Sequence, residues 1–132
     1  MADFLERAQR AVEAGLAYAR DHELRMTFVV VDRTTQPVAA ARMDGARLGT
    51  WDIAVAKANT AFRFQSPTIE LKGRIVPENR AAIQALMERI VFLGGGVPIA
   101  EDGELVGAIG ASGGVEDQDV ESAAACLAAF LR

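Results

Sequence analysis

Glycine is concentrated in one stretch of the chain, Gly94–Asp119, which holds 8 of the 12 glycines. The stretch predicts a short strand around Val97–Ala100, a hairpin turn at Asp102-Gly103 and a second strand over Glu104–Ala111, followed by a glycine-rich corner into a helix. Glycine permits positive φ and close backbone approach, at a cost in conformational entropy. The cluster therefore indicates either tight turns in a small antiparallel sheet, or a backbone at Gly110–Gly114 that a ligand or another subunit approaches.

The rest of the chain predicts helices around a further pair of strands. Apolar residues recur at helical spacing over about residues 4–20, 51–62 and 116–131, and Pro residues open shorter helices near 66–72 and 77–90. The helix near 77–90 is predicted to have a buried side formed by Ala82, Ile83, Leu86, Met87 and Ile90. Met26–Val31 and Val38–Arg42 predict a hairpin. Hairpins at both ends of a sheet, with helices packed on it, indicate an α/β chain of the α+β layer class, and 132 residues predict one domain over 1–132.

Composition excludes several functional classes. A net charge of −4 without a basic run argues against nucleic acid as a partner. No apolar stretch is long enough to span a bilayer and no signal peptide is evident, so we expect a cytoplasmic protein without a membrane partner. The single cysteine, Cys126, excludes an intrachain disulfide and a multi-cysteine metal site, and its Ala-rich helical face predicts a buried, inert thiol.

The residue types of common catalytic sites are scarce. His22 is the only histidine and lies in the polar exit of the first helix. It is interpreted as an exposed helix-end residue, with an axial or metal ligand as the alternative; no other metal ligand is predicted. Neither a Walker A motif nor a dinucleotide fingerprint nor a G-x-S-x-G elbow is present.

Two places combine polar groups with a special position. Lys57 and Thr60 share a helical row with apolar residues, which indicates either a lysine that extends to water or a ligand or interface role. The helix start after Ser112 has free N–H groups that suit an anion. Its own acids repel an anion, unless a cation such as Arg42 or Lys57 lies nearby. Arg42 and Asp44 flank a turn, where a solvated contact of little energetic value is the alternative.

Five ordered motifs resemble the GlcG/HbpS family, also called the haem-degrading or DUF336 domain, which is similar to the C-terminal domain of PduO-type proteins. The motifs are Asp32, Arg42-Met43-Asp44-Gly45-Ala46, Asp52-x-Ala54-x-x-Lys57-Ala58-x-Thr60-Ala61, Gly95-Gly96-Val97-Pro98-Ile99 and Gly107-Ala108-Ile109-Gly110-Ala111-Ser112-Gly113 with Asp119. The resemblance implies a profilin-like fold with a five-stranded antiparallel sheet between helices, assembled as homodimers or octamers. The family's usual Asp-x-x-Gly-x-Leu turn is replaced here by Asp32–Pro37.

The resemblance also implies function. Some family members bind haem and are associated with haem breakdown or redox sensing, and others accompany glycolate, propanediol or aromatic catabolism. The first hypothesis is a small-ligand-binding protein whose candidate ligand is haem or a related tetrapyrrole, with propionates paired to Arg42 and Lys57. The ligand-binding candidates are Arg42, Asp44, Lys57, Thr60, Ser112 and Gly113.

Two alternatives stay open beside haem binding. The chain is either a cofactor-independent enzyme acting on a small organic acid or an aromatic-catabolism intermediate, or its charged motifs are structural ion pairs that hold an oligomer. As an enzyme, its catalytic candidates are Asp44, Lys57 and Asp119: a cation binds the carboxylate and an aspartate moves a proton. The sequence leaves the question of enzymatic activity open.

Overall fold

One antiparallel sheet of four strands organises residues 2–132, the part of the chain that the computed structural model describes. The strand order is β2-β1-β4-β3, so the two hairpins lie side by side and β1 pairs with β4. The strands are β1 Thr27–Asp32, β2 Pro37–Arg42, β3 Gly96–Glu101 and β4 Glu104–Ser112. The helices are α1 Phe4–Asp21, α2 Gly49–Phe64, α3 Thr68–Arg74, α4 Pro77–Leu86 and α5 Glu116–Leu131. The α+β class and the antiparallel sheet predicted from the sequence are confirmed.

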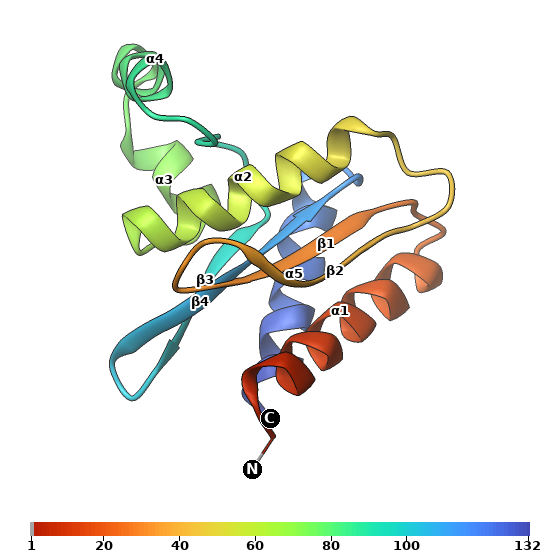
Figure 1. The fold of residues 1–132 in the computed structure, drawn as a ribbon. Helices are drawn as coiled ribbons and strands as arrows, with labels where there is room; N and C mark the ends of the chain where they lie inside the picture. Colours follow the sequence, from red (N-terminus) through yellow and green to blue (C-terminus); the bar gives the residue numbers. More distant parts are fainter. Residues whose placement is uncertain (1) are drawn as a thin grey trace.

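Helices cover both faces of the sheet, as Figure 1 shows: α1 and α5 lie on one face and α2 crosses the other. Successive side chains of a strand point to opposite faces. Phe28 and Val30 therefore pack against α1 and α5, whereas Val29 and Val31 pack against Ala54 and neighbouring alanines of α2. The continuous apolar run of β1 results from burial of the strand on both faces.

The glycines of β3 and β4 let α2 pack directly on the sheet. A Cβ at Gly110 would lie 1.9 Å from the carbonyl oxygen of Ala54, and one at Gly96 would lie 2.4 Å from that of Lys57. Such distances are shorter than van der Waals contact, so only glycine fits at either position. Part of the glycine cluster thus serves close packing between helix and sheet.

Helix α3 contacts β3 through Thr68, which accepts from Gly96 N at 2.9 Å, and α4 is the outermost element in Figure 1. The prediction that the fourth helix carries Leu86 and Ile90 on a buried side is wrong, although Ile83 is half-buried and packs toward Leu71, Ile90 and Phe92. The helix ends at Leu86, which is 85% exposed, and none of its residues is buried. Ile90 is buried, but it lies in the following loop and packs on Leu71 and Phe92. Among the described residues, α4 is covered only in part, where Ile83 packs on the cluster formed by Leu71, Ile90 and Phe92.

The sheet has four strands within the described residues, where the family resemblance implies five. The segment between α4 and β3 does not pair as a strand. Its backbone is instead bound by side chains of other elements: Asn59 Nδ2 donates to Arg89 O at 2.8 Å, and Val91 N donates to Thr60 Oγ1 at 3.0 Å. Because α2 satisfies these backbone groups, the segment follows the helix rather than the edge of the sheet.

Candidate functional site

A cavity of about 780 Å³ lies where the connection from α1 to β1 and the loop before α2 meet the corner between β4 and α5. Its walls combine glycine backbone, four apolar side chains and several charged groups. The lining residues that bear on its chemistry are Leu24, Arg25, Arg47, Ile53, Lys57, Leu93, Ser112, Gly113, Val115 and Asp119. The glycine-rich corner predicted as a site of close approach thus forms part of a cavity wall.

A buried ion pair lies at this cavity. Lys57 Nζ donates to Asp119 Oδ2 and to the carbonyl oxygen of Ala111, both at 2.9 Å, and Gly114 N donates to Asp119 Oδ1 at 2.9 Å. The two charged side chains are only 2% and 7% exposed. Lys57 therefore does not extend to bulk water. A Cβ at Gly95 would lie 2.9 Å from Lys57 Nζ, so the glycine preceding β3 makes room for the ammonium group.

Burial raises the pKa of Asp119 above its usual range, and the neighbouring Lys57 opposes that rise through its hydrogen bond and its charge. The pair is costly to desolvate, and the attraction of the two charges together with their further hydrogen bonds offsets that cost. Removal of either partner would leave an unmatched charge in the interior. Buried carboxyl groups with a raised pKa beside a cavity are candidate proton-transfer groups.

Glu116, another of the three acids in the first turn of α5, is also matched by a cation. Glu116 Oε1 accepts from Lys72 Nζ at 2.9 Å, and its Oε2 accepts from Gly94 N at 2.9 Å. The hydrogen bond from Gly94 N has the largest effect in lowering the pKa of Glu116, and the bond from Lys72 lowers it further. The sequence predicts that the acids at this helix start repel an anion. Pairing of Asp119 and Glu116 with lysines removes part of that repulsion, while the third acid, Asp117, is exposed to solvent.

Four of the residues predicted from the sequence come together at the cavity: Lys57, Ser112, Gly113 and Asp119 line it. The structure places the other three elsewhere. Arg42 is exposed at the end of β2, and Asp44 is exposed in the following turn. Thr60 is fully buried within α2, and its hydroxyl donates to Ala56 O at 2.7 Å while accepting from the loop that follows α4.

Two arginines that the sequence argument did not single out line the cavity. Arg25 precedes β1, and its Nη1 donates to Asp44 O at 3.2 Å. Arg47 lies in the loop before α2, and its side chain makes no hydrogen bond or ion pair with a residue in the range 2–132. Both lie in polar connections that match no motif. Only the path of the chain brings them to one cavity.

His22 caps the C-terminus of α1 and is exposed. Its ring stacks on Tyr18 with the centroids 4.0 Å apart, and its Nδ1 lies 2.8 Å from Tyr18 O. A carbonyl oxygen only accepts hydrogen bonds, so Nδ1 is the donor in this contact. His22 itself does not line the cavity, but the next residue, Glu23, does.

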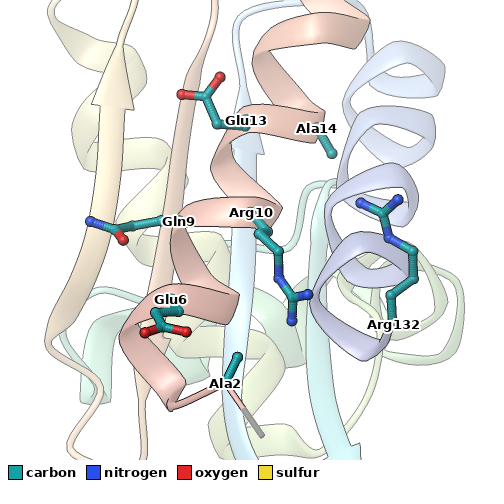
Figure 2. Close-up of a pocket in the computed structure, with 7 residues that line it drawn as sticks. All are labelled: Ala2, Glu6, Gln9, Arg10, Glu13, Ala14 and Arg132. Carbon is teal, nitrogen blue, oxygen red and sulfur yellow. The ribbon is translucent and has the colours of Figure 1, made fainter.

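A second depression, of about 570 Å³, lies beside α1 and the C-terminus. Figure 2 shows Glu6, Gln9 and Glu13 extending from α1, with the side chains of Arg10 and Arg132 near the space between α1 and α5. All five side chains are exposed. Because it lacks a buried polar group, this depression has weaker means of orienting a ligand than the cavity at Lys57.

Within residues 2–132, no group of three or more His, Cys, Asp or Glu residues is arranged to hold a metal ion. No helix in the same range has the length and hydrophobicity needed to cross a membrane.

Comparison with known proteins relates the chain to a described family. The model of the family described as "Haem degrading protein HbpS-like" matches residues 4–128 of this chain. An uncharacterized 15.0 kDa protein from the dhaT-dhaS intergenic region of Citrobacter freundii is 34% identical over 119 residues, which cover 87% of this chain and 82% of that protein. The corrinoid adenosyltransferase PduO of Salmonella typhimurium is 34% identical over 120 residues, but the match spans only 35% of its length. The solved structure of a PduOC:heme complex superposes with a TM-score of 0.89 at 27% identity, covering 98% of this chain and 95% of the other.

Proposed function

The chain belongs to the HbpS-like family, as its motifs predict, and we propose that it is a small-ligand-binding protein whose candidate ligand is haem or a related tetrapyrrole. The observation that carries the proposal is the cavity of about 780 Å³, in which apolar walls lie beside two arginines. A structural neighbour of similar fold is a haem complex, which supports the choice of ligand. We also propose that the fold is profilin-like, as the family resemblance implies.

The cavity fits the periphery of a tetrapyrrole better than its metal. Leu24, Ile53 and Leu93 offer apolar surface, and Arg25 and Arg47 suit propionates, a role that the sequence argument gave to Arg42. The lining contains none of the usual iron ligands, which are histidine, cysteine, methionine and tyrosine.

His22 is therefore the candidate iron ligand at the edge of this site. It directly precedes the lining residue Glu23, and its Nδ1–H bond to Tyr18 O orients the ring and leaves Nε2 free, as in many histidine–metal sites. Bound haem iron would supply one-electron redox chemistry. Because haem iron would supply this chemistry, the proposal includes haem degradation and redox sensing.

Titration of the purified protein with hemin, followed at the Soret band, tests the proposal. We expect a saturable Soret shift in the wild type, which weakens or moves in wavelength in His22→Ala. Arg20→Ala, an exposed change one position before the end of the same helix, is the matched control and should bind as the wild type does. Absence of a saturable shift in the wild type would remove haem as the ligand, and equal spectra for both variants would remove His22 as the iron ligand.

We further propose that the protein self-associates, as a homodimer or an octamer. Exposed apolar side chains at the two ends of α4 support this, because Leu86, its last residue, is 85% exposed and Val76, its N-cap, is 51% exposed. Leu86→Glu should then reduce the mass measured by multi-angle light scattering. An unchanged mass would place the contact elsewhere.

A cofactor-independent enzyme acting on a small organic acid is the second candidate function. It is favoured by one observation, the buried Asp119 carboxyl, whose pKa is raised by burial beside the cavity. In a screen of carboxylic acid substrates, Asp119→Asn should abolish turnover, and Asp44→Asn, outside the cavity, should not. If turnover is found and is equal in both variants, Asp119 has no part in the mechanism.

A further inference from the structure

We infer that Ser112, Arg47 and Arg25, three residues that line the cavity, form a carboxylate-binding subsite. The inference rests on the proposed ligand-binding function of this cavity, and it names one chemical group that the ligand carries.

Ser112 is the first observation. It is 5% exposed and lines the cavity, and its hydroxyl has no hydrogen-bond partner among residues 2–132. Other buried hydroxyls of the fold are satisfied: Thr27 and Thr50 bond each other at 2.9 Å, and Thr68 accepts from Gly96 N at 2.9 Å. Ser112 Oγ still reaches solvent in the cavity, because the fully buried side-chain polar atom that lacks a partner within residues 2–132 is Arg80 Nε instead. The hydroxyl of Ser112 is therefore open to water or to a ligand in the cavity.

The charges around Ser112 are the second observation. Arg25, Arg47 and Lys57 line the cavity together with two acids, Glu23 and Asp119. Lys57 is engaged by Asp119 at 2.9 Å, which leaves two exposed guanidinium groups and one exposed carboxylate, Glu23, among the charged lining residues. The excess positive charge is modest. It suits a monoanion better than a doubly charged phosphate.

The position of α5 adds to the positive electrostatic potential around Ser112. Ser112 is the last residue of β4, and α5 begins four residues later at Glu116. The helix runs for 16 residues, and its dipole is positive at this end. The Gly114 and Val115 amides are already taken by Asp119 and Gln118. The ligand's direct partners are therefore the hydroxyl and the guanidinium groups.

A planar carboxylate matches these donors. A guanidinium group can donate two parallel hydrogen bonds to the two carboxylate oxygens, and a serine hydroxyl adds a third donor. Arg47, with no partner of its own in the described chain, is the cation free to make the bidentate contact. The same chemistry would accept a propionate of a tetrapyrrole or a free organic acid.

The test is titration of the ¹⁵N-labelled full chain with sodium propionate and, separately, with inorganic phosphate and with hemin. Propionate should give saturable amide shifts centred on Ser112–Val115 and the loop at Arg47. Arg47→Gln should weaken binding about tenfold or more, as expected for loss of a charge-assisted pair. Arg42→Gln makes the same change of charge outside the cavity and should leave the binding constant unchanged. Ser112→Ala should weaken binding by a smaller factor without loss of fold.

The outcomes separate the subsite from the proposed function. Equal binding by Arg47→Gln and Arg42→Gln, or shifts elsewhere on the molecule, would overturn the subsite even if hemin binds. Preference for phosphate over propionate would overturn the carboxylate class. Propionate binding that depends on Arg47, in a protein that does not bind hemin, would support the subsite and refute only the tetrapyrrole.

Discussion

Replacement of Lys57 by methionine tests the ion pair on which the candidate site is built. Methionine keeps most of the apolar length of the lysine and removes its charge, so Asp119 keeps only the hydrogen bond from Gly114 N, at 2.9 Å. The carboxylate stays 7% exposed, and the Ala111 carbonyl also loses its donor. Breaking a buried pair costs about 3–5 kcal/mol. We expect the lower end of that range, because one backbone donor remains.

The loss of stability in Lys57→Met should be larger at neutral pH than at acidic pH. Burial raises the pKa of Asp119 in the folded protein, so the folded chain binds this proton more readily than the unfolded chain. The free energy of unfolding therefore falls as pH rises through that window. In Lys57→Met the opposing effect of the ammonium is gone and the pKa rises further. The variant should lose most stability at neutral pH and recover much of it as the pH is lowered towards the ordinary pKa of aspartate.

Urea unfolding followed by circular dichroism, at a series of pH values, measures this effect. The double variant Lys57→Met/Asp119→Asn removes both charges and should recover most of the stability at neutral pH, because replacing both members of a buried pair is often nearly neutral. A loss below about 1 kcal/mol for Lys57→Met would mean that the pair is hydrated in solution. A loss that is the same at every pH would show that an unmatched Asp119 charge is not its cause.

Three further predictions concern the fold around the site. Gly110→Ala should destabilise by about 3 kcal/mol or more, since its Cβ would lie 1.9 Å from a carbonyl oxygen of α2, whereas Gly73→Ala, with nothing within 4 Å, should stabilise slightly in thermal melts. Cys126 is fully buried, and burial raises its pKa to about 12, so it should resist alkylation by iodoacetamide at pH 8 until the chain is unfolded; rapid native labelling would contradict this. The hydrogen bonds from Arg7 lower the pKa of Glu101, so the stability from this pair is present above the ordinary glutamate pKa and is lost as pH falls through the lowered one. Glu101→Gln should flatten that acid limb, and an unchanged limb would refute the assignment.

Sequence reasoning reached the secondary structure well where the signal was local. The continuous β-favouring run of β1, the Asp102-Gly103 turn and the helical spacing of α1 and α5 all depend on near neighbours. It failed at Leu86, where helical periodicity continued but the fold offers no layer against which the side chain can be buried. Periodicity describes a face. It does not show whether another element covers that face.

The site was harder to predict, because its parts meet only through tertiary packing. Helical spacing placed Lys57 between apolar residues, but its partner Asp119 lies 62 residues further along the chain. Their contact depends on the glycines that bring α2 close to the sheet. Arg42 and Arg47 are five positions apart and equally charged, and only the course of the loop before α2 decides that the second lines the cavity.

The most direct test of the central claim is to locate the bound ligand on the protein. Iron(III) in hemin is paramagnetic, so amide resonances near bound hemin broaden in the spectrum of the ¹⁵N-labelled chain. We predict that broadening is greatest at Glu23–Arg25, at Arg47 and at Ser112–Val115, which surround the cavity. Broadening centred on Glu6, Gln9 and Arg10 of the depression beside α1, or no broadening at all, would contradict the account.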